Sequence, residues 1–252
     1  MYTIMATVSW FTKEEDWLLK RPIIFNKNLV KLTFIEVGRL LRLLGRLDGN
    51  RLLDLCCGIG RHSLEFARHG FQVTGVDITR AYLDIAAANA QKQDQSIEFV
   101  HSDMKDFCRK ESFDVIVNLC TSFGYFDEID DDIQVLRNIY QSLAKKGKFV
   151  IEILGKEVIA SAFRPVEELE FEGYKVRAIS RILDDWSRLE CRRIITRNGL
   201  ESEIVAYHRL YSATELRTHL TKTGFTNIRV YGDFAGSPYD NEAKSMIMIA
   251  EK

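Results

Sequence analysis

A glycine turn between an expected strand and an expected helix is the strongest chemical signal in this chain. Residues 51–63 read RLLDLCCGIGRHS, an apolar run followed by Gly58 and Gly60. Glycines let the backbone approach a ligand closely, and the helix that follows offers unpaired N–H groups in its first turn. A second apolar run ends at Asp77, where a carboxylate can accept hydrogen bonds from the two hydroxyls of a ribose. The spacing predicts a nucleoside-binding pocket.

Acidic residues are expected at the ends of three successive strands. Asp54 lies in the end of the first strand, Asp77 ends the second, and Asp103 with Met104 falls just past the third. The carboxyl ends of parallel strands meet at one edge of a sheet, and ligands of open α/β sheets bind there, where the strand order reverses. These acids are therefore expected to share one crevice.

The turn itself distinguishes two nucleoside ligands. The dinucleotide fingerprint G-x-G-x-x-G lacks its third glycine, since Gly60 is followed by Arg61-His62-Ser63, and this disfavours pyrophosphate binding. Asp54-Leu55-Cys56-Cys57-Gly58-Ile59-Gly60 instead resembles the first motif of the class I S-adenosylmethionine-dependent methyltransferases, an acidic residue followed by a glycine turn. Cys56 stands in place of the usual first glycine, and we expect a small side chain to suffice. The resemblance covers residues 50–155 and 211–252.

The resemblance implies S-adenosylmethionine as cofactor, S-adenosylhomocysteine as product and no metal. Asp77 would hold the ribose, Ile78 would pack on the adenine, and Asp103, beside Met104, would bond the adenine amino group. The turn would face the amino-acid end of the cofactor, and the residues after the fourth strand would line its methionine part. The predicted cofactor-binding residues are Asp54, Cys56, Cys57, Gly58, Gly60, Asp77, Ile78, Asp103, Met104, Asn118 and Leu119.

Methyl transfer from a sulfonium is an in-line displacement that needs no nucleophile or metal, so no catalytic residue is assigned. A base would help if the acceptor is a hydroxyl or an ammonium. Tyr125, Tyr207 and His208 are candidates by position, and each also has an ordinary packing or polar explanation.

The elements that position these residues alternate along the chain. Strands are expected over 51–56, 71–76, 97–101, 113–119 and 148–154, and helices over 61–69, 79–91 and 129–145. Such alternation predicts parallel pairing through right-handed crossovers. With a helix over 212–223 and strands over 226–234 and 245–250, we expect an α/β fold with a doubly wound, mostly parallel seven-stranded sheet.

The alternation of expected strands and helices ends after the fifth strand. Apolar runs over 169–171, 174–183, 188–197 and 203–211 are separated by turn signals, among them Asp184-Asp185 and Asn198-Gly199, which predicts an antiparallel β insertion. We expect residues 49–161 and 210–252 to form the cofactor-binding domain, and 162–209 to roof the acceptor site or form a dimer contact. Residues 1–48 are an expected helical lid segment in which Trp10, Phe11 and Trp17 either cover the cofactor or pack on the sheet.

Composition and charge limit the kinds of partner that this chain is expected to have. A net charge of −1, and equal numbers of basic and acidic residues within the insertion, do not favour a nucleic-acid partner. Residues 118–121, NLCT, depart from the Asn-Pro-Pro-Tyr motif of enzymes that methylate amino groups of nucleic-acid bases and protein glutamines. Five cysteines without a C-x-x-C pair argue against a disulfide framework or a zinc site and for a reducing cytoplasm. No apolar run approaches the roughly 18 residues of a membrane span.

The favoured hypothesis is a methyltransferase that acts on an O or N atom of a small molecule, as a monomer or homodimer in the cytoplasm. Three alternatives stay open: a methyltransferase for RNA or protein, a nicotinamide-dependent dehydrogenase, and a noncatalytic cofactor-binding module. The identity of the acceptor is not readable from these motifs, because fold-level resemblance does not transfer a substrate.

Overall fold

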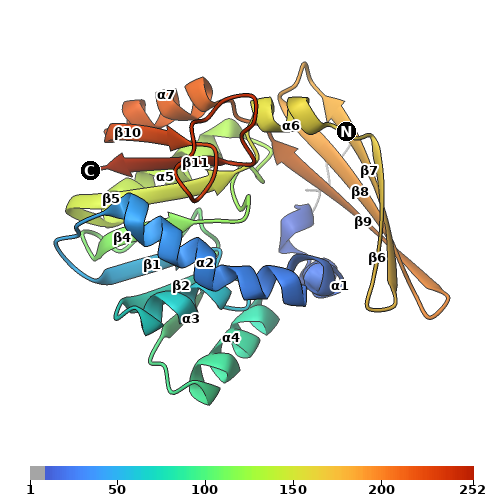
Figure 1. Ribbon diagram of the computed structural model, residues 1–252, viewed down its shortest axis with the longest axis horizontal. Coiled ribbons are helices and arrows are strands. Elements are labelled where there is room, and N and C mark those ends of the chain that lie inside the picture. Colours follow the sequence, from blue (N-terminus) through green and yellow to red (C-terminus); the bar gives the residue numbers. More distant parts are fainter. Residues whose placement is uncertain (1–8) are drawn as a thin grey trace, which may run out of the picture.

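A seven-stranded sheet forms the core of the protein (Figure 1). The computed structural model describes residues 9–252, so residues 1–8 of the expected lid segment lie outside the described residues. The strands of this sheet are β1 (Arg51–Leu55), β2 (Gln72–Asp77), β3 (Glu98–His101), β4 (Phe113–Asn118), β5 (Leu143–Ile153), β10 (Thr226–Tyr231) and β11 (Met246–Glu251). Their order is β10-β11-β5-β4-β1-β2-β3. The pairs from β3 to β5 are parallel, and β11 and β10 are antiparallel additions. The expected doubly wound fold is confirmed.

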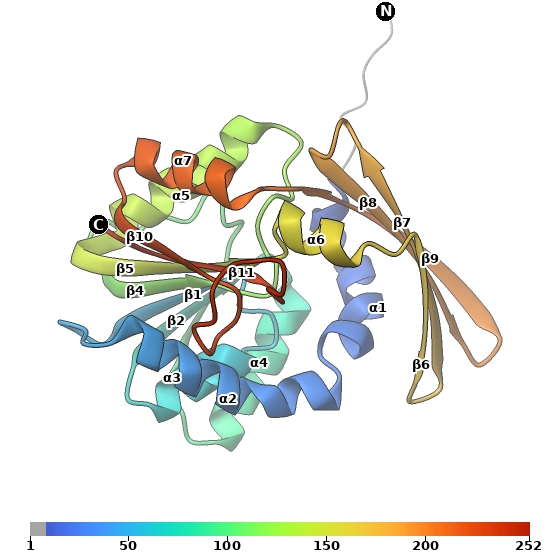
Figure 2. The ribbon, with the colours of Figure 1, turned by 45° about the horizontal axis from the view of Figure 1, so that its top comes forward.

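Helices cover both faces of this sheet (Figure 2). One layer consists of α2 (Lys27–Leu44), α3 (Arg61–Arg68) and α4 (Arg80–Lys92), and the other of α5 (Ile129–Ser142) and α7 (Ala213–Thr223). Each layer buries its own apolar cluster: Leu40 and Phe66 pack against one face, and Leu136 and Leu216 against the other. This burial holds the carboxyl ends of the strands at one edge.

Local signals set several helix ends as expected. Ser212 begins α7 with a capping box, in which its hydroxyl accepts from the Glu215 N–H and the Glu215 carboxylate accepts from the Ser212 N–H. The helix expected over 129–145 ends earlier, at Ser142. Leu143 is extended and fully buried, and Lys145 to Gly147 form an irregular stretch at the start of β5 rather than a turn before it.

The expected β insertion is present as a separate four-stranded antiparallel sheet. Its strands are β6 (Val166–Phe171), β7 (Tyr174–Leu183), β8 (Arg188–Arg197) and β9 (Leu200–Arg209), paired in chain order. The two predicted turns join β7 to β8 and β8 to β9. A short helix, α6 (Lys156–Ala162), connects β5 to this sheet and was not expected from the sequence pattern.

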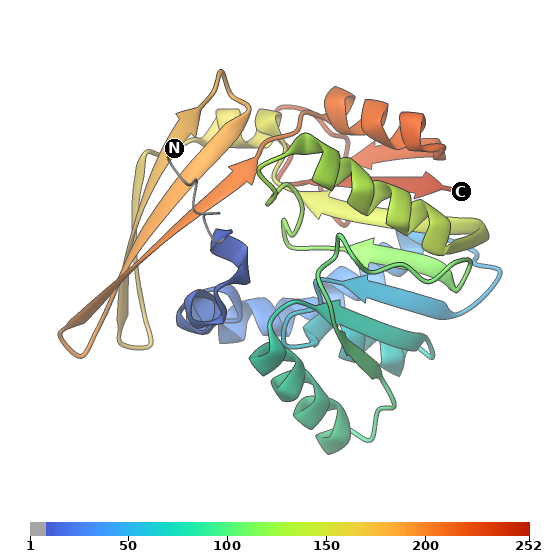
Figure 3. The ribbon, with the colours of Figure 1, turned by 180° about the vertical axis from the view of Figure 1, so that it is seen from behind.

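The N-terminal segment lies between the two sheets (Figure 3). It consists of a 3-10 turn, η1 (Trp10–Thr12), and helix α1 (Glu14–Ile24), followed by α2. The helical region expected over 9–47 is thus two helices, and the Asn26 side chain caps the second by accepting from the N–H groups of Asn28 and Leu29. Ile23 of α1 packs against the apolar cluster of the second sheet. No helix among residues 9–252 is both long and apolar enough to cross a membrane.

Candidate functional site

A cavity of about 990 Å³, its open mouth included, lies at the carboxyl ends of β1 to β4. Of the predicted cofactor-binding residues, Gly60 and Asn118 do not line it. Gly60 begins α3, and Asn118 is fully buried behind the wall with its Nδ2 3.1 Å from the Leu55 carbonyl oxygen. The other predicted residues all line the cavity: Asp54, Cys56, Cys57, Gly58, Asp77, Ile78, Asp103, Met104 and Leu119.

The turn after β1 depends on left-handed backbone. Gly58 and Gly60 have φ of 55° and 75°, and Cys56 has φ of 64°. The expectation that a small side chain suffices at Cys56 therefore misses the main constraint, which is the backbone conformation that glycine adopts without strain. A Cβ at Gly58 would lie 2.6 Å from the ring of Phe25, so the lack of a side chain lets the N-terminal segment close over the turn.

Asp77 is held in place by the turn that it faces. One carboxylate oxygen accepts from the Gly58 N–H at 2.8 Å, and the other accepts from the Thr79 N–H at 2.8 Å. Burial raises the pKa of Asp77, while these two backbone donors act in the opposite direction. Each oxygen keeps a further lone pair, so the carboxylate can also accept from two ligand hydroxyls.

The two other acids face the same cavity from either side. Asp54 is buried and accepts from the Ser63 hydroxyl at 2.6 Å, and half-buried Asp103 accepts from the Lys105 N–H at 2.8 Å. Burial raises the pKa of both carboxyl groups. It also raises the pKa of the Cys56 and Cys57 thiols, with the nearby carboxylates adding to the shift, so neither cysteine presents a thiolate nucleophile.

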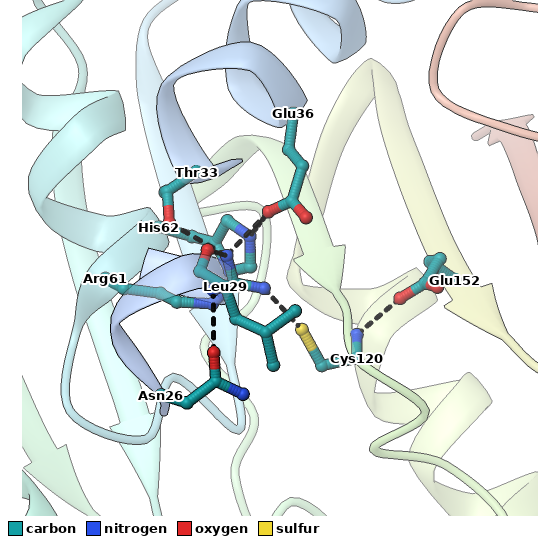
Figure 4. A network of polar contacts seen from close by, with 8 residues as sticks. All are labelled: Asn26, Leu29, Thr33, Glu36, Arg61, His62, Cys120 and Glu152. Atoms are coloured by element: carbon teal, nitrogen blue, oxygen red, sulfur yellow. Dashed lines mark hydrogen bonds and ion pairs between the residues drawn. The ribbon is translucent and has the colours of Figure 1, made fainter. Parts of the chain in front are cut away.

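A polar network that the sequence analysis missed closes one side of the cavity (Figure 4). The Glu36 carboxylate of α2 accepts from Arg61 Nη1 at 2.6 Å and lies 3.1 Å from His62 Nε2. Arg61 also contacts the Cys120 sulfur at 3.0 Å, and the Cys120 N–H donates to Glu152 at 2.6 Å. His62 is thus a packed polar residue. The sequence feature that could have revealed this network is an acidic residue, Glu36, among the apolar residues of α2.

The candidate bases behave differently from one another. Tyr125 lines the cavity, and burial raises the pKa of its phenol, so the hydroxyl stays protonated. Burial lowers the pKa of His208, which packs against Tyr125, to about 3, so the imidazole stays neutral at ordinary pH. Tyr207 points to the opposite face of β9, where its hydroxyl contacts Glu190 at 3.1 Å. The structure therefore does not bring Tyr207 to the cavity.

Aromatic side chains of the N-terminal segment complete the wall. Phe11 and Trp17 line the cavity, and the Trp17 indole N–H donates to the Phe11 carbonyl at 2.7 Å. Phe25 and Tyr82, which the sequence analysis did not select, also line it, and the Tyr82 hydroxyl donates to the Trp17 carbonyl. Within residues 9–252, no group of three or more His, Cys, Asp or Glu side chains is arranged to hold a metal ion.

The family model and the relatives that match this chain are methyltransferases. Residues 52–147 match a family model described as a methyltransferase domain. A putative methyltransferase of Geobacillus is 26% identical, over 86% of this chain and 90% of the relative. The glycine/sarcosine N-methyltransferase of Aphanothece halophytica is also 26% identical, over 80% of this chain and 76% of its own length.

The fold is shared with solved structures as well. A crystal structure of an S-adenosylmethionine-dependent methyltransferase from Clostridium acetobutylicum superposes with a TM-score of 0.77 at 15% identity, covering 94% of this chain and 97% of that one. The matched domain spans β1 to the start of β5, the part of the chain that carries the glycine turn and the three acids. Residues 52–147 of this chain form a methyltransferase domain, and the chain has the fold of an S-adenosylmethionine-dependent methyltransferase.

Proposed function

We propose that this enzyme transfers the methyl group of S-adenosylmethionine to an O or N atom of a small-molecule acceptor by in-line displacement. The observation that carries the proposal is the aromatic wall that Phe11, Trp17 and Tyr125 form where they line the cavity. Such a wall leaves room for a small acceptor and excludes water from the reacting atoms. The name of the glycine/sarcosine N-methyltransferase relative also supports a small acceptor.

The cavity residues fit the cofactor chemically. The fixed Asp77 carboxylate has acceptor capacity for both ribose hydroxyls, and Asp103 is placed to accept from the adenine amino group. Ile78 and Met104 would supply apolar surface for the adenine ring, and Arg61, which also lines the cavity, would bind the cofactor carboxylate. The cofactor, when bound, supplies the activated methyl group, so the proposed reaction needs no metal.

The protein's own contribution to the reaction is orientation. Tyr125 keeps its proton, so its hydroxyl can donate to the acceptor and align the attacking lone pair. Helix α1 lies between the seven-stranded sheet and the second sheet (Figure 2), and we assign residues 162–209 the role of roof behind α1. A near-neutral chain with balanced charge in this roof offers no electrostatic footprint for RNA. Within residues 9–252 every cysteine is free, which supports a reducing compartment.

The test follows the methyl group. The enzyme is incubated with radiolabelled S-adenosylmethionine and separately with the small-molecule, RNA and protein fractions of a cell extract. Label is expected in the small-molecule fraction only, and Asp77→Ala should abolish it. Label in RNA or protein with none in small molecules would overturn the proposed acceptor class, and no transfer to any fraction by an enzyme that binds the cofactor would indicate a noncatalytic module.

A further inference from the structure

The Lys20 side chain of α1 is buried without an ionic partner. Only 3% of Lys20 is exposed, and among the described residues no carboxylate lies within ion-pair distance of its ammonium. The ammonium instead lies over two indole rings, 4.4 Å from the ring centre of Trp10 and 4.7 Å from that of Trp17. Burial of an unpaired charge is costly, so such residues are usually kept for function.

The second sheet presents a cationic side chain, Arg193, and a neutral imidazole, His208, toward α1. Arg193 and His208 lie on the same face of β8 and β9 as Ile195 and Ile204, the face that packs against Ile23 of α1. The paired registers place no carboxylate on this face of β7, β8 or β9, and on β6 they place Glu167 there, two strands away from Arg193. Arg193 has no ion-pair or hydrogen-bond partner within residues 9–252.

Two buried hydrogen-bonding nitrogens in the same cluster also lack partners. The indole nitrogen of Trp10 and Nδ1 of His208 have none among the described residues. The two rings are in contact, with centres 5.4 Å apart. Buried polar groups in folded proteins are nearly always paired, so these two groups side by side indicate a missing hydrogen-bonding partner, which for the Trp10 N–H must be an acceptor.

The charges around Lys20 support the same conclusion. Burial lowers the pKa of Lys20 to about 8, and the positive charge of Arg193 adds to the shift. Asp16, one turn earlier on α1, acts in the opposite direction without forming an ion pair. Burial is the main cause of the lowered pKa of His208, and the positive charges of Arg193 and Lys20 add to it, so both cations act on this imidazole.

We propose that Trp10, Lys20, Arg193 and His208 form a subsite that binds an anionic group, a carboxylate or a phosphate, on the methyl acceptor. Tyr125 connects this anion subsite to the cofactor cavity, because its ring lies 4.9 Å from Trp10 and 5.1 Å from His208 while it also lines the cavity. An acceptor anchored here places its remaining atoms along Tyr125, toward the methyl group. The assignment of the anion to the acceptor depends on the proposed function, whereas anion binding itself does not.

Tryptophan fluorescence provides a direct readout. The chain has three tryptophans, and Trp186 lies at the β7–β8 turn outside the subsite. In a Trp186→Phe background, emission therefore reports on Trp10 and Trp17, which flank Lys20. The protein, saturated with S-adenosylhomocysteine, is titrated with sodium acetate and with sodium phosphate, and sodium chloride at matched ionic strength serves as reference. A saturable change with acetate assigns a carboxylate, and one with phosphate assigns a phosphate.

Matched variants separate the subsite from general charge effects. Lys20→Met and Arg193→Gln should each weaken the anion response on the order of tenfold or more, since each removes a charged donor. Lys20→Arg should retain the response. Arg192→Gln is the control, because Arg192 lies on the opposite face of β8 and pairs with Glu203.

A failure of the anion subsite can be distinguished from a failure of the proposed function. Calorimetry on the same samples measures the binding of S-adenosylhomocysteine. We expect this binding to be unchanged in all the variants, which would show that each variant has folded. No saturable response to either anion beyond chloride, or the same curve for Lys20→Met as for the parent protein, would overturn the anion subsite. Loss of cofactor binding in the parent protein would instead overturn the cofactor assignment.

Discussion

At the residue scale, the Asp77 carboxylate has two tasks, since it fastens the glycine turn through two backbone donors and faces the cavity with its remaining lone pairs. Both tasks together require an aspartate at position 77. A longer acid would move the oxygens away from Gly58 and Thr79, and an amide would place an N–H group against one of those donors.

Asp77→Ala should weaken S-adenosylhomocysteine binding on the order of 100-fold, because hydrogen bonds to a charged acceptor are among the stronger polar contacts. Isothermal calorimetry measures the loss. The control is Asp84→Ala on the exposed surface of α4, where the carboxylate pairs only with Arg80. Affinity that stays within about threefold of the parent would show that Asp77 does not hold the ribose.

Cys56 offers a test of the backbone argument. At φ of 64° a residue with a Cβ is strained, so Cys56→Gly should be about 1 kcal/mol more stable than Cys56→Ala. Both substitutions remove the sulfur that lies 3.6 Å from the Met104 sulfur, so their difference isolates the Cβ. Urea unfolding gives the comparison, and equal stabilities would show that side-chain size, not φ, governs this position.

Lys20 predicts a pH dependence of stability. Its pKa is lowered from 10.5 to about 8, so below pH 8 both folded and unfolded chains are charged and the folded state bears the full penalty, roughly 3 kcal/mol. Between pH 8 and 10.5 the folded chain releases its proton while the unfolded chain keeps it, so stability rises with pH in this window.

Lys20→Met removes this penalty. In urea unfolding, the variant should have a higher free energy of unfolding than the parent protein at pH 7. This difference should be about 2 kcal/mol smaller at pH 9.5. An equal difference at both pH values, or a variant less stable than the parent at pH 7, would mean that the ammonium is well accommodated by its surroundings and that the subsite has no unpaired charge.

At the element scale, a buried carboxylate joins the insertion to the sheet domain. Asp132 of α5 is fully buried and accepts from the Tyr211 hydroxyl at 2.7 Å and from Arg209 Nε at 3.0 Å. Arg209 ends β9, and Tyr211 precedes α7. This one side chain therefore fixes how the chain returns from the roof to the sheet, which in turn positions β9 and His208.

Tyr211→Phe should lower the free energy of unfolding by about 1 to 3 kcal/mol, because a buried carboxylate loses a hydrogen-bond donor that water cannot replace. Denaturant unfolding measures the change. Tyr231→Phe in β10 is the matched control, since its hydroxyl has no hydrogen-bond partner within residues 9–252. A loss no greater than that of the control would show that Arg209 alone satisfies Asp132.

At the scale of the whole molecule, the cavity is lined by parts that the chain contributes separately, the sheet edge and the N-terminal segment, and the second sheet lies on the far side of α1 (Figures 2 and 3). The cofactor would contact the sheet edge and the N-terminal segment together, through Asp77 and Phe25. Ligand binding is therefore expected to stabilise the entire fold by mass action.

S-adenosylhomocysteine at about 100 times its dissociation constant should raise Tm by roughly 5 to 10 °C in a thermal melt. NAD at the same concentration should leave Tm unchanged, since the turn lacks the third glycine of the pyrophosphate fingerprint. A shift with NAD and none with S-adenosylhomocysteine would favour the dehydrogenase alternative over the cofactor assigned to this chain.

The sequence by itself determined the features that depend on neighbouring residues. Alternating apolar runs specify strands and helices, the Asn198-Gly199 pair specifies a hairpin, and the spacing from the glycine turn to Asp77 specifies a nucleoside pocket. Each of these signals is local because hydrogen bonding and φ preferences act over a few residues. The fold class and most of the predicted cavity residues followed from them.

Only the tertiary structure decided which distant segments meet. Glu36 pairs with Arg61, Phe25 closes over Gly58, and Lys20 of α1 lies near Arg193 and His208 of the second sheet. No periodicity encodes such contacts, because they result from the packing of surfaces whose shapes depend on every side chain between them. For the same reason one sequence motif predicts the proposed cofactor site, whereas the proposed anion subsite depends on contacts between α1 and the second sheet.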